Sequence, residues 1–215
     1  MATPSLPLQF LLLTLLLLLL HTSANTPQSR KPIANNPLTD YIKSSCKATR
    51  YPAACLQSLM AYANAIRQNE LRLVQTALTV SITRTQSCAF FVKTAARQKG
   101  IQAREAQAVK DCLDNMHSSI DSLTQSAKEL NGLTGRASAQ DFAWHMSNVQ
   151  TWVSAAMTYQ STCLDGFSGP YYRTMNGRFK SAITAKVVNA SQVTSNALAF
   201  VNRFASKHLT QTPSN

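Results

Sequence analysis

Cysteine and histidine are the side chains of this sequence best suited to chemistry, and both are scarce. The five cysteines are Cys46, Cys55, Cys88, Cys112 and Cys163. The histidines beyond residue 25 are His117, His145 and His208. Cys88 and His117 lie on consecutive predicted helices and could form a thiol–imidazole pair. A cysteine on an apolar helix face is more often a packing residue, so we expect no chemistry from this pair.

Two carboxylates, Asp111 and Asp114, stand three residues apart on a predicted helix, close enough to act as an acid–base pair. Arg104 and Lys110 offer them ordinary surface partners, which favours a solvated helix face. The sequence also lacks G-x-S-x-G, H-E-x-x-H, a Walker loop and the glycine pattern of dinucleotide binding. We therefore expect no enzyme activity, no metal and no cofactor.

Composition favours one compact helical domain. The chain has 215 residues, of which 45% are hydrophobic and 14% charged, too apolar for a disordered chain and too poor in charge for a coiled coil. Six glycines are too few for a turn-rich β-sandwich. Trp144 and Trp152, eight residues apart, are expected to pack at the edge of the core.

The N-terminal residues predict secretion. An apolar run of eleven residues, 10–20, would span about 16 Å as a helix, short of the roughly 30 Å of a bilayer core. Small residues at positions 22 and 24 suit signal peptidase, so we expect a signal peptide over residues 1–24. Residues 25–37 are predicted to form a flexible lead-in, and no membrane association is expected after cleavage. Outside the cell, two disulfides and one free thiol are expected.

Basic residues outnumber acidic ones by 21 to 9, a formal charge of +12. They are scattered along the sequence without interleaved aromatic residues, so we expect no nucleic-acid binding. An acidic extracellular polymer is a better match for this charge. A local concentration at Arg173, Arg178, Lys180 and Lys186 is expected to be a solvated face.

Apolar periodicity predicts four long helices over residues 69–208, near residues 70–99, 102–130, 138–167 and 177–208. Short loops between them predict an all-α, up-down-up-down four-helix bundle. The second helix has the clearest pattern, with spacings of three and four. Its expected core residues are Ala106, Val109, Leu113, Met116, Ile120, Leu123, Ala127 and Leu130.

Residues 38–62 predict a helical hairpin ahead of the bundle. Pro52 cannot continue a helix through both Cys46 and Cys55, and a bend there lets their sulfur atoms approach. The whole folded domain is expected over residues 38–210. Asn189-Ala190-Ser191 is an acceptor sequence for N-glycosylation, which the secretory route makes available.

Three segments resemble the plant invertase/pectin methylesterase inhibitor family. Residues 45–59, SCKATRYPAACLQSL, are similar to its opening motif, and residues 111–114, DCLD, are similar to its third-cysteine motif. Residues 148–167, NVQTWVSAAMTYQSTCLDGF, are similar to the block around its fourth cysteine. The resemblance implies a disulfide-linked four-helix bundle with an N-terminal hairpin.

The resemblance also implies a cysteine pairing, first with second and third with fourth. Here this gives Cys46–Cys55 and Cys112–Cys163, with Cys88 as a free thiol. Geometry alone leaves an alternative open, because a turn at Gly100 would place Cys88 and Cys112 opposite each other on adjacent helices.

Two functions compete within that family, inhibition of pectin methylesterase and inhibition of acid invertase. The invertase inhibitors carry Pro-Lys-Phe before the fourth cysteine, whereas residues 130–163 here contain no proline. The resemblance thus implies an apoplastic inhibitor that binds pectin methylesterase one to one over its substrate cleft, with Thr162 in contact. Acid invertase inhibition is the alternative, and a secreted helical-bundle ligand or carrier is a third reading.

Overall fold

The computed structural model describes residues 36–97, 101–133, 138–168 and 177–209. The predicted signal peptide and most of the predicted lead-in fall outside these ranges, as does Gly100. Throughout the described ranges the regular structure is helical, without a strand.

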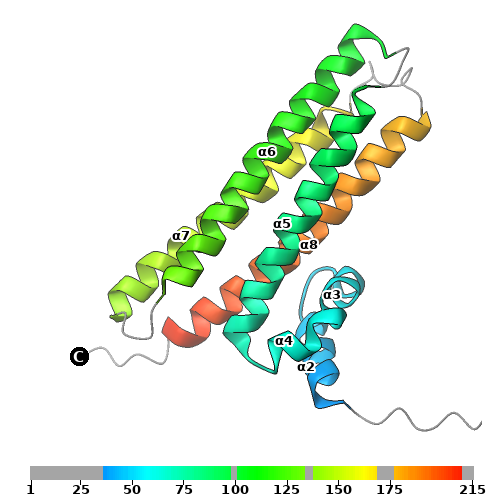
Figure 1. The fold of residues 1–215 in the computed structure, drawn as a ribbon. Coiled ribbons are helices and arrows are strands. Elements are labelled where there is room, and N and C mark those ends of the chain that lie inside the picture. Colours follow the sequence, from blue (N-terminus) through cyan, green and yellow to red (C-terminus); the bar gives the residue numbers. More distant parts are fainter. Residues whose placement is uncertain (1–35, 98–100, 134–137, 169–176, 210–215) are drawn as a thin grey trace, which may run out of the picture. The chain divides into compact units, whose positions relative to one another are not determined.

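Four long helices form the bundle that the sequence predicts. They are α5 (Glu70–Ala95), α6 (Ala103–Gly132), α7 (Ala139–Asp165) and α8 (Gly177–Leu209). Each packs against the next along the chain, and α8 returns to pack against α5. Successive helices run in opposite directions (Figure 1). The prediction of an all-α, up-down-up-down bundle is confirmed.

Helix ends follow local hydrogen bonding. Ser138 caps α7, because its hydroxyl oxygen accepts a hydrogen bond of 3.1 Å from the Asp141 amide while the Asp141 carboxylate accepts from the Ser138 amide. The predicted end of the second helix was too early: α6 continues through Asn131 and Gly132, and the backbone becomes extended only at Leu133. The first long helix, α5, ends at Ala95, several residues before its predicted end.

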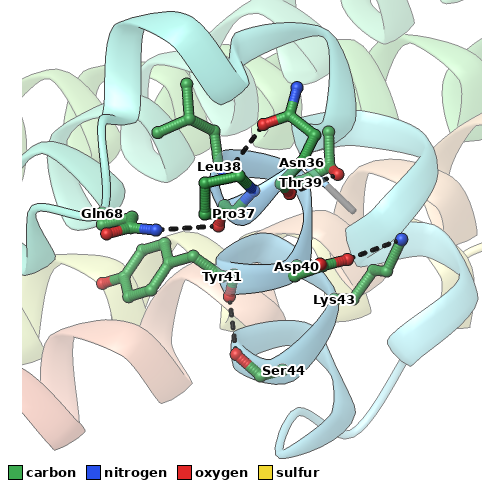
Figure 2. Close-up of polar contacts among 9 residues, drawn as sticks. All are labelled: Asn36, Pro37, Leu38, Thr39, Asp40, Tyr41, Lys43, Ser44 and Gln68. Atoms are coloured by element: carbon green, nitrogen blue, oxygen red, sulfur yellow. Dashed lines mark hydrogen bonds and ion pairs between the residues drawn. The ribbon is translucent and has the colours of Figure 1, made fainter. Parts of the chain in front are cut away.

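The hairpin contains α2 (Pro37–Lys47) and α3 (Pro52–Leu59), followed by a 3₁₀ turn, η1 (Met60–Tyr62), and a short helix, α4 (Ala63–Ile66). Helix α2 begins at Pro37, one residue before the predicted start of the folded domain. The Asn36 side chain accepts a hydrogen bond of 3.0 Å from the Leu38 amide, and Pro37 fits the first helical position because it needs no backbone donor there (Figure 2).

A left-handed turn joins the hairpin to the bundle. Arg67 and Gln68 have φ of 48° and 57°, and these are the two non-glycine residues with positive φ in the described chain. The Gln68 amide donates a hydrogen bond of 2.9 Å to the carbonyl oxygen of Pro37 (Figure 2). This bond ties the turn back to the start of α2.

The hairpin packs on α5 and α8 through α3. Asn196 of α8 is almost fully buried and binds the backbone of Tyr51 twice. Its side-chain oxygen accepts from the Tyr51 amide at 3.1 Å, and its side-chain nitrogen donates to the Tyr51 carbonyl oxygen at 2.9 Å. These bonds hold the bend before α3 against the last helix.

The buried face of α6 differs from the prediction. Ala106 is exposed, and Leu113, Ile120 and Ala127 are only half-buried. The face in the core keeps the expected spacing, and small polar residues alternate there with apolar ones. Its residues are Val109, Cys112, Met116, Ser119, Leu123, Ser126 and Leu130. Ser119 can be buried because its hydroxyl donates to the Ala156 carbonyl oxygen of α7 at 3.0 Å. Val109, Met116, Leu123 and Leu130 are therefore confirmed as core residues, and a pattern of apolar residues alone missed the buried serines.

A polar cluster at Gln160 crosses the bundle core. Gln160 of α7 is fully buried, and its side-chain nitrogen donates to the hydroxyl oxygens of Thr85 on α5, at 3.2 Å, and Thr194 on α8, at 3.1 Å. Each threonine hydroxyl in turn donates to a carbonyl oxygen of its own helix. The side-chain oxygen of Gln160 has no partner among the described residues.

Candidate functional site

The structure contains two disulfides, one in the hairpin and one in the bundle. Cys46 is bonded to Cys55, and Cys112 of α6 is bonded to Cys163 of α7, with Cα atoms 5.6 Å and 4.3 Å apart respectively. This is the pairing that the family resemblance implies. The alternative bond between Cys88 and Cys112 is not formed.

Cys88 is a free thiol inside the core. Burial raises its pKa to about 11, although nearby Lys186 acts in the opposite direction. The thiol is therefore protonated and unreactive at neutral pH. His117 is exposed, and no hydrogen bond joins it to Cys88 in the described chain, so the two residues form no nucleophilic pair.

Asp111 and Asp114 are both exposed on α6. Asp111 accepts a hydrogen bond of 2.7 Å from the side-chain amide of Gln107, one helical turn earlier. This is an ordinary surface interaction, although its partner is Gln107 and not the arginine or lysine that we expected. In the described chain, no group of three or more His, Cys, Asp or Glu residues is placed to hold a metal ion.

Helix α7 carries large aromatic side chains on its outer surface. Trp144, Trp152 and Tyr159 are 60%, 41% and 38% exposed. The expectation that both tryptophans pack at the edge of the core is therefore wrong for Trp144, which is mostly exposed. The buried stripe of α7 runs through Met146, Val149, Val153, Ala156, Gln160 and Cys163. Helical periodicity places Trp144 on the opposite side of the helix and Trp152 at the margin of this stripe, next to Val153.

Thr162 lies on the same outer surface, three residues after Tyr159, and is exposed. Its hydroxyl donates to the Thr158 carbonyl oxygen at 3.0 Å and keeps its own lone pairs free to accept a hydrogen bond. We call Trp144, Trp152, Tyr159 and Thr162 the α7 aromatic face. The neighbouring disulfide at Cys163 fixes the end of α7 that carries Thr162 to α6.

A hydrogen-bonded group joins α6 and α7 next to this face. One carboxylate oxygen of Glu129 lies 2.8 Å from the ring nitrogen Nδ1 of His145 and accepts a bond of 2.9 Å from the Asn148 side chain. These bonds, from Asn148 first and then His145, lower the pKa of Glu129. The His145 ring also packs edge-on against Trp144, with centroids 4.9 Å apart. Sequence reasoning missed this group because its members are far apart in the chain.

Charge is divided between the two halves of the bundle. Helices α6 and α7 together carry seven acidic and three basic residues, a formal charge of −4. Helices α5 and α8 carry eight basic residues and one acidic residue, a formal charge of +7. The basic residues are thus concentrated on one half, contrary to our expectation that they are scattered.

The predicted basic cluster and the predicted glycosylation site lie on or just before α8. Arg173 and the side chain of Arg178 lie outside the described structure, while Lys180 is half-buried and Lys186 is exposed, 5.8 Å from the centroid of the Phe91 ring. Asn189 is half-buried next to the fully packed Ala190. Its glycosylation stays a prediction. None of the described helices is long and apolar enough to cross a membrane.

The described residues thus form a disulfide-linked helical bundle with an aromatic face on the outer side of α7. The profile of the plant invertase/pectin methylesterase inhibitor family matches residues 40–200. The chain belongs to this family of inhibitors.

Relatives and solved structures agree with this assignment. A 21 kDa protein of Daucus carota is 48% identical over 80% of this chain and 87% of its own length. Pectinesterase inhibitor 11 of Arabidopsis thaliana is 45% identical over 91% of this chain and 96% of its own. The crystal structure of a mutant form of a pectin methylesterase inhibitor from Arabidopsis matches the fold with a TM-score of 0.57, at 20% identity, over 81% of this chain and 98% of that chain.

Proposed function

We propose that this protein inhibits pectin methylesterase by binding the enzyme one to one over its substrate cleft. The observation that carries the proposal is the 45% identity to a pectinesterase inhibitor over nearly the whole of both chains. The protein itself does no chemistry, and inhibition follows from steric exclusion of the polysaccharide.

The α7 aromatic face is the proposed contact surface. Tryptophan and tyrosine are enriched among the residues that dominate binding energy, because they bury large rigid surfaces with little loss of side-chain freedom. The Cys112–Cys163 bond and the Glu129 hydrogen bonds hold α6 and α7 together, so little conformational entropy is lost on binding. Thr162 adds an exposed hydroxyl to this surface.

Within the family, pectin methylesterase is favoured over acid invertase as the target. Residues 130–163 contain no proline and so lack the Pro-Lys-Phe motif of the invertase inhibitors. The proposed site of action is the cell wall, reached through the signal peptide over residues 1–24. The net charge of +12 also supports attraction to acidic pectin there.

The experiment is a parallel titration of a plant pectin methylesterase and an acid invertase with the protein purified from plant cells. We expect stoichiometric inhibition of the first enzyme alone. Inhibition of invertase with none of pectin methylesterase would overturn the assignment.

Variants of the α7 aromatic face test the proposed surface. Thr162→Arg places a long charged side chain in the contact, and Trp152→Ala removes an anchor, so each should weaken inhibition about tenfold or more with little change in Tm. Phe90→Ala is the matched control, because Phe90 is 73% exposed on α5 and lies outside this face. Equal loss of inhibition in the Phe90 variant would contradict the surface, though not the inhibitory function.

A further inference from the structure

A concave surface lies between the hairpin and α5, and no residue of α6 or α7 contributes to it. Its volume of about 340 Å³ falls within the range of about 300–1,000 Å³ that is usual for small-molecule sites. Gln57 and Ser58 of α3, Tyr62 of η1, and Val80, Arg84 and Ser87 of α5 line it. We call it the Arg84 pocket.

The pocket has a buried floor and a polar, exposed rim. Ser58 and Val80 are 7% and 5% exposed and form the floor. Tyr62 is 43% exposed at the rim. The Ser58 hydroxyl donates to the Cys55 carbonyl oxygen at 3.0 Å, so its oxygen remains available as an acceptor. A ligand would meet an aromatic ring, hydroxyl groups and a side-chain amide around a small apolar base.

Arg84 is the charged group of the pocket, and its charge is not neutralised. All nine acidic residues of the chain lie in the described ranges, and none of them forms an ion pair with Arg84. A second pocket, beside α2, differs in this respect. There the carboxylate oxygens of Glu70 lie 3.5 Å from the Arg203 side-chain nitrogen Nε and 2.9 Å from Lys207 Nζ, so both basic groups are already paired with a carboxylate of the protein.

We infer that the Arg84 pocket binds a hexuronate unit of an acidic polysaccharide. The guanidinium group of Arg84 can hold the sugar carboxylate through two parallel hydrogen bonds, a geometry that arginine provides and lysine does not. The Tyr62 ring offers an apolar surface to the C–H face of a pyranose. The polar groups of Gln57, Ser58 and Ser87 can exchange hydrogen bonds with the sugar hydroxyls.

The charge of the surroundings supports an anionic ligand. The pocket lies on the half of the bundle whose two helices carry a formal charge of +7. An extended polyanion bound at Arg84 therefore meets further positive charge on α5 and α8, which accelerates its association. A neutral polysaccharide gains nothing from this field.

The inference is independent of the proposed enzyme inhibition, because the Arg84 pocket shares no residue with the α7 aromatic face. Binding of uronate with no inhibition of pectin methylesterase would contradict only the proposed function. Inhibition without uronate binding would contradict only the pocket.

Isothermal titration calorimetry, with trigalacturonate added to the protein purified from plant cells, tests the pocket. We expect saturable binding that is lost when the sugar carboxylates are methyl-esterified and is absent with neutral galactose trimer. Equal binding of the methyl ester, or no binding of trigalacturonate at millimolar concentration, would overturn the inference.

Arginine variants locate the site. Arg84→Ala should lower the affinity for trigalacturonate about tenfold or more, and Arg84→Lys should restore only part of it, because lysine keeps the charge without the paired hydrogen bonds. Arg72→Ala is the matched control, since Arg72 is also exposed on α5 but does not line the pocket. Equal losses in the Arg84 and Arg72 alanine variants would show general attraction to a basic surface and overturn the assignment of the pocket.

Discussion

The α6–α7 half of the bundle and the α5–α8 half share one core but present different surfaces. The first is acidic and carries the three exposed aromatic side chains of α7, whereas the second is basic and supports the hairpin. The difference shows that a four-helix core leaves the outer positions of each helix pair free to vary. The two proposed binding surfaces, the α7 aromatic face and the Arg84 pocket, therefore lie on different halves of one domain.

The halves also differ in how they are joined. A disulfide connects α6 to α7, and the described part of the α5–α8 half has no covalent counterpart. The hairpin is held on that half by the two hydrogen bonds between Asn196 and Tyr51 and by side-chain packing. We expect perturbation of the α6–α7 link to give the larger loss of stability.

Cys163→Ser should have the largest effect. The Cys112–Cys163 bond closes a loop with a sequence separation of 51, for which the chain-entropy estimate is about 4 kcal/mol, compared with about 2.6 kcal/mol for the separation of 9 at Cys46–Cys55. Urea unfolding without reductant measures the loss in free energy of unfolding. Cys88→Ser should cost much less, because Cys88 closes no loop. Greater damage from Cys88→Ser than from Cys163→Ser would contradict this order.

Gln160→Met tests the polar connection between the halves. The substitution removes a buried carbonyl oxygen that has no partner, while Thr85 and Thr194 keep the bonds that their hydroxyls donate to their own helices. We expect a gain of about 1 kcal/mol in the free energy of unfolding. Gln125→Met, on the exposed surface of α6, is the control. A clear loss of stability would instead indicate a bound internal water at Gln160.

Acid should weaken the α6–α7 half specifically. The folded state lowers the pKa of Glu129 below its unfolded value of about 4.3, so the stabilisation is complete above that pH and is lost as pH falls through the folded pKa. Asn148→Ala should therefore flatten the decline of the urea midpoint between about pH 5 and pH 3. Glu129→Gln removes the titrating group and should flatten it as well. An unchanged decline in both variants would exclude Glu129 as a source of the acid sensitivity. This is the smallest of the expected effects.

Much of the fold was predictable because strong local signals agreed with the tertiary structure. The proline at position 52 and the apolar periodicity of residues 69–208 specified the hairpin and the four long helices that the structure contains. Part of the buried stripe of α6 was not predicted, because Ser119 and Ser126 enter the core by donating hydrogen bonds to carbonyl oxygens. A count of apolar residues does not detect such serines.

The surfaces were harder to predict than the core. Trp144 and Trp152 are large and apolar, and only their position relative to the buried stripe of α7 shows that they face solvent. The Arg84 pocket combines residues of the hairpin with residues of α5, so no single segment of sequence contains its pattern. Gln160 likewise finds its hydrogen-bond partners far away in the chain, at Thr85, 75 residues earlier, and at Thr194, 34 residues later.

The left-handed pair at Arg67 and Gln68 decides where the hairpin can go. Each non-glycine residue in this conformation costs on the order of 1–3 kcal/mol, so the turn exists because other contacts hold it. Gln68 is one such contact, through its bond to Pro37. Arg67 and Gln68 separate α4 from α5, so the chain changes direction between the hairpin and the bundle. The geometry of this turn therefore sets the direction in which α5 leaves the hairpin, and the Gln68 bond fixes that direction to the start of α2.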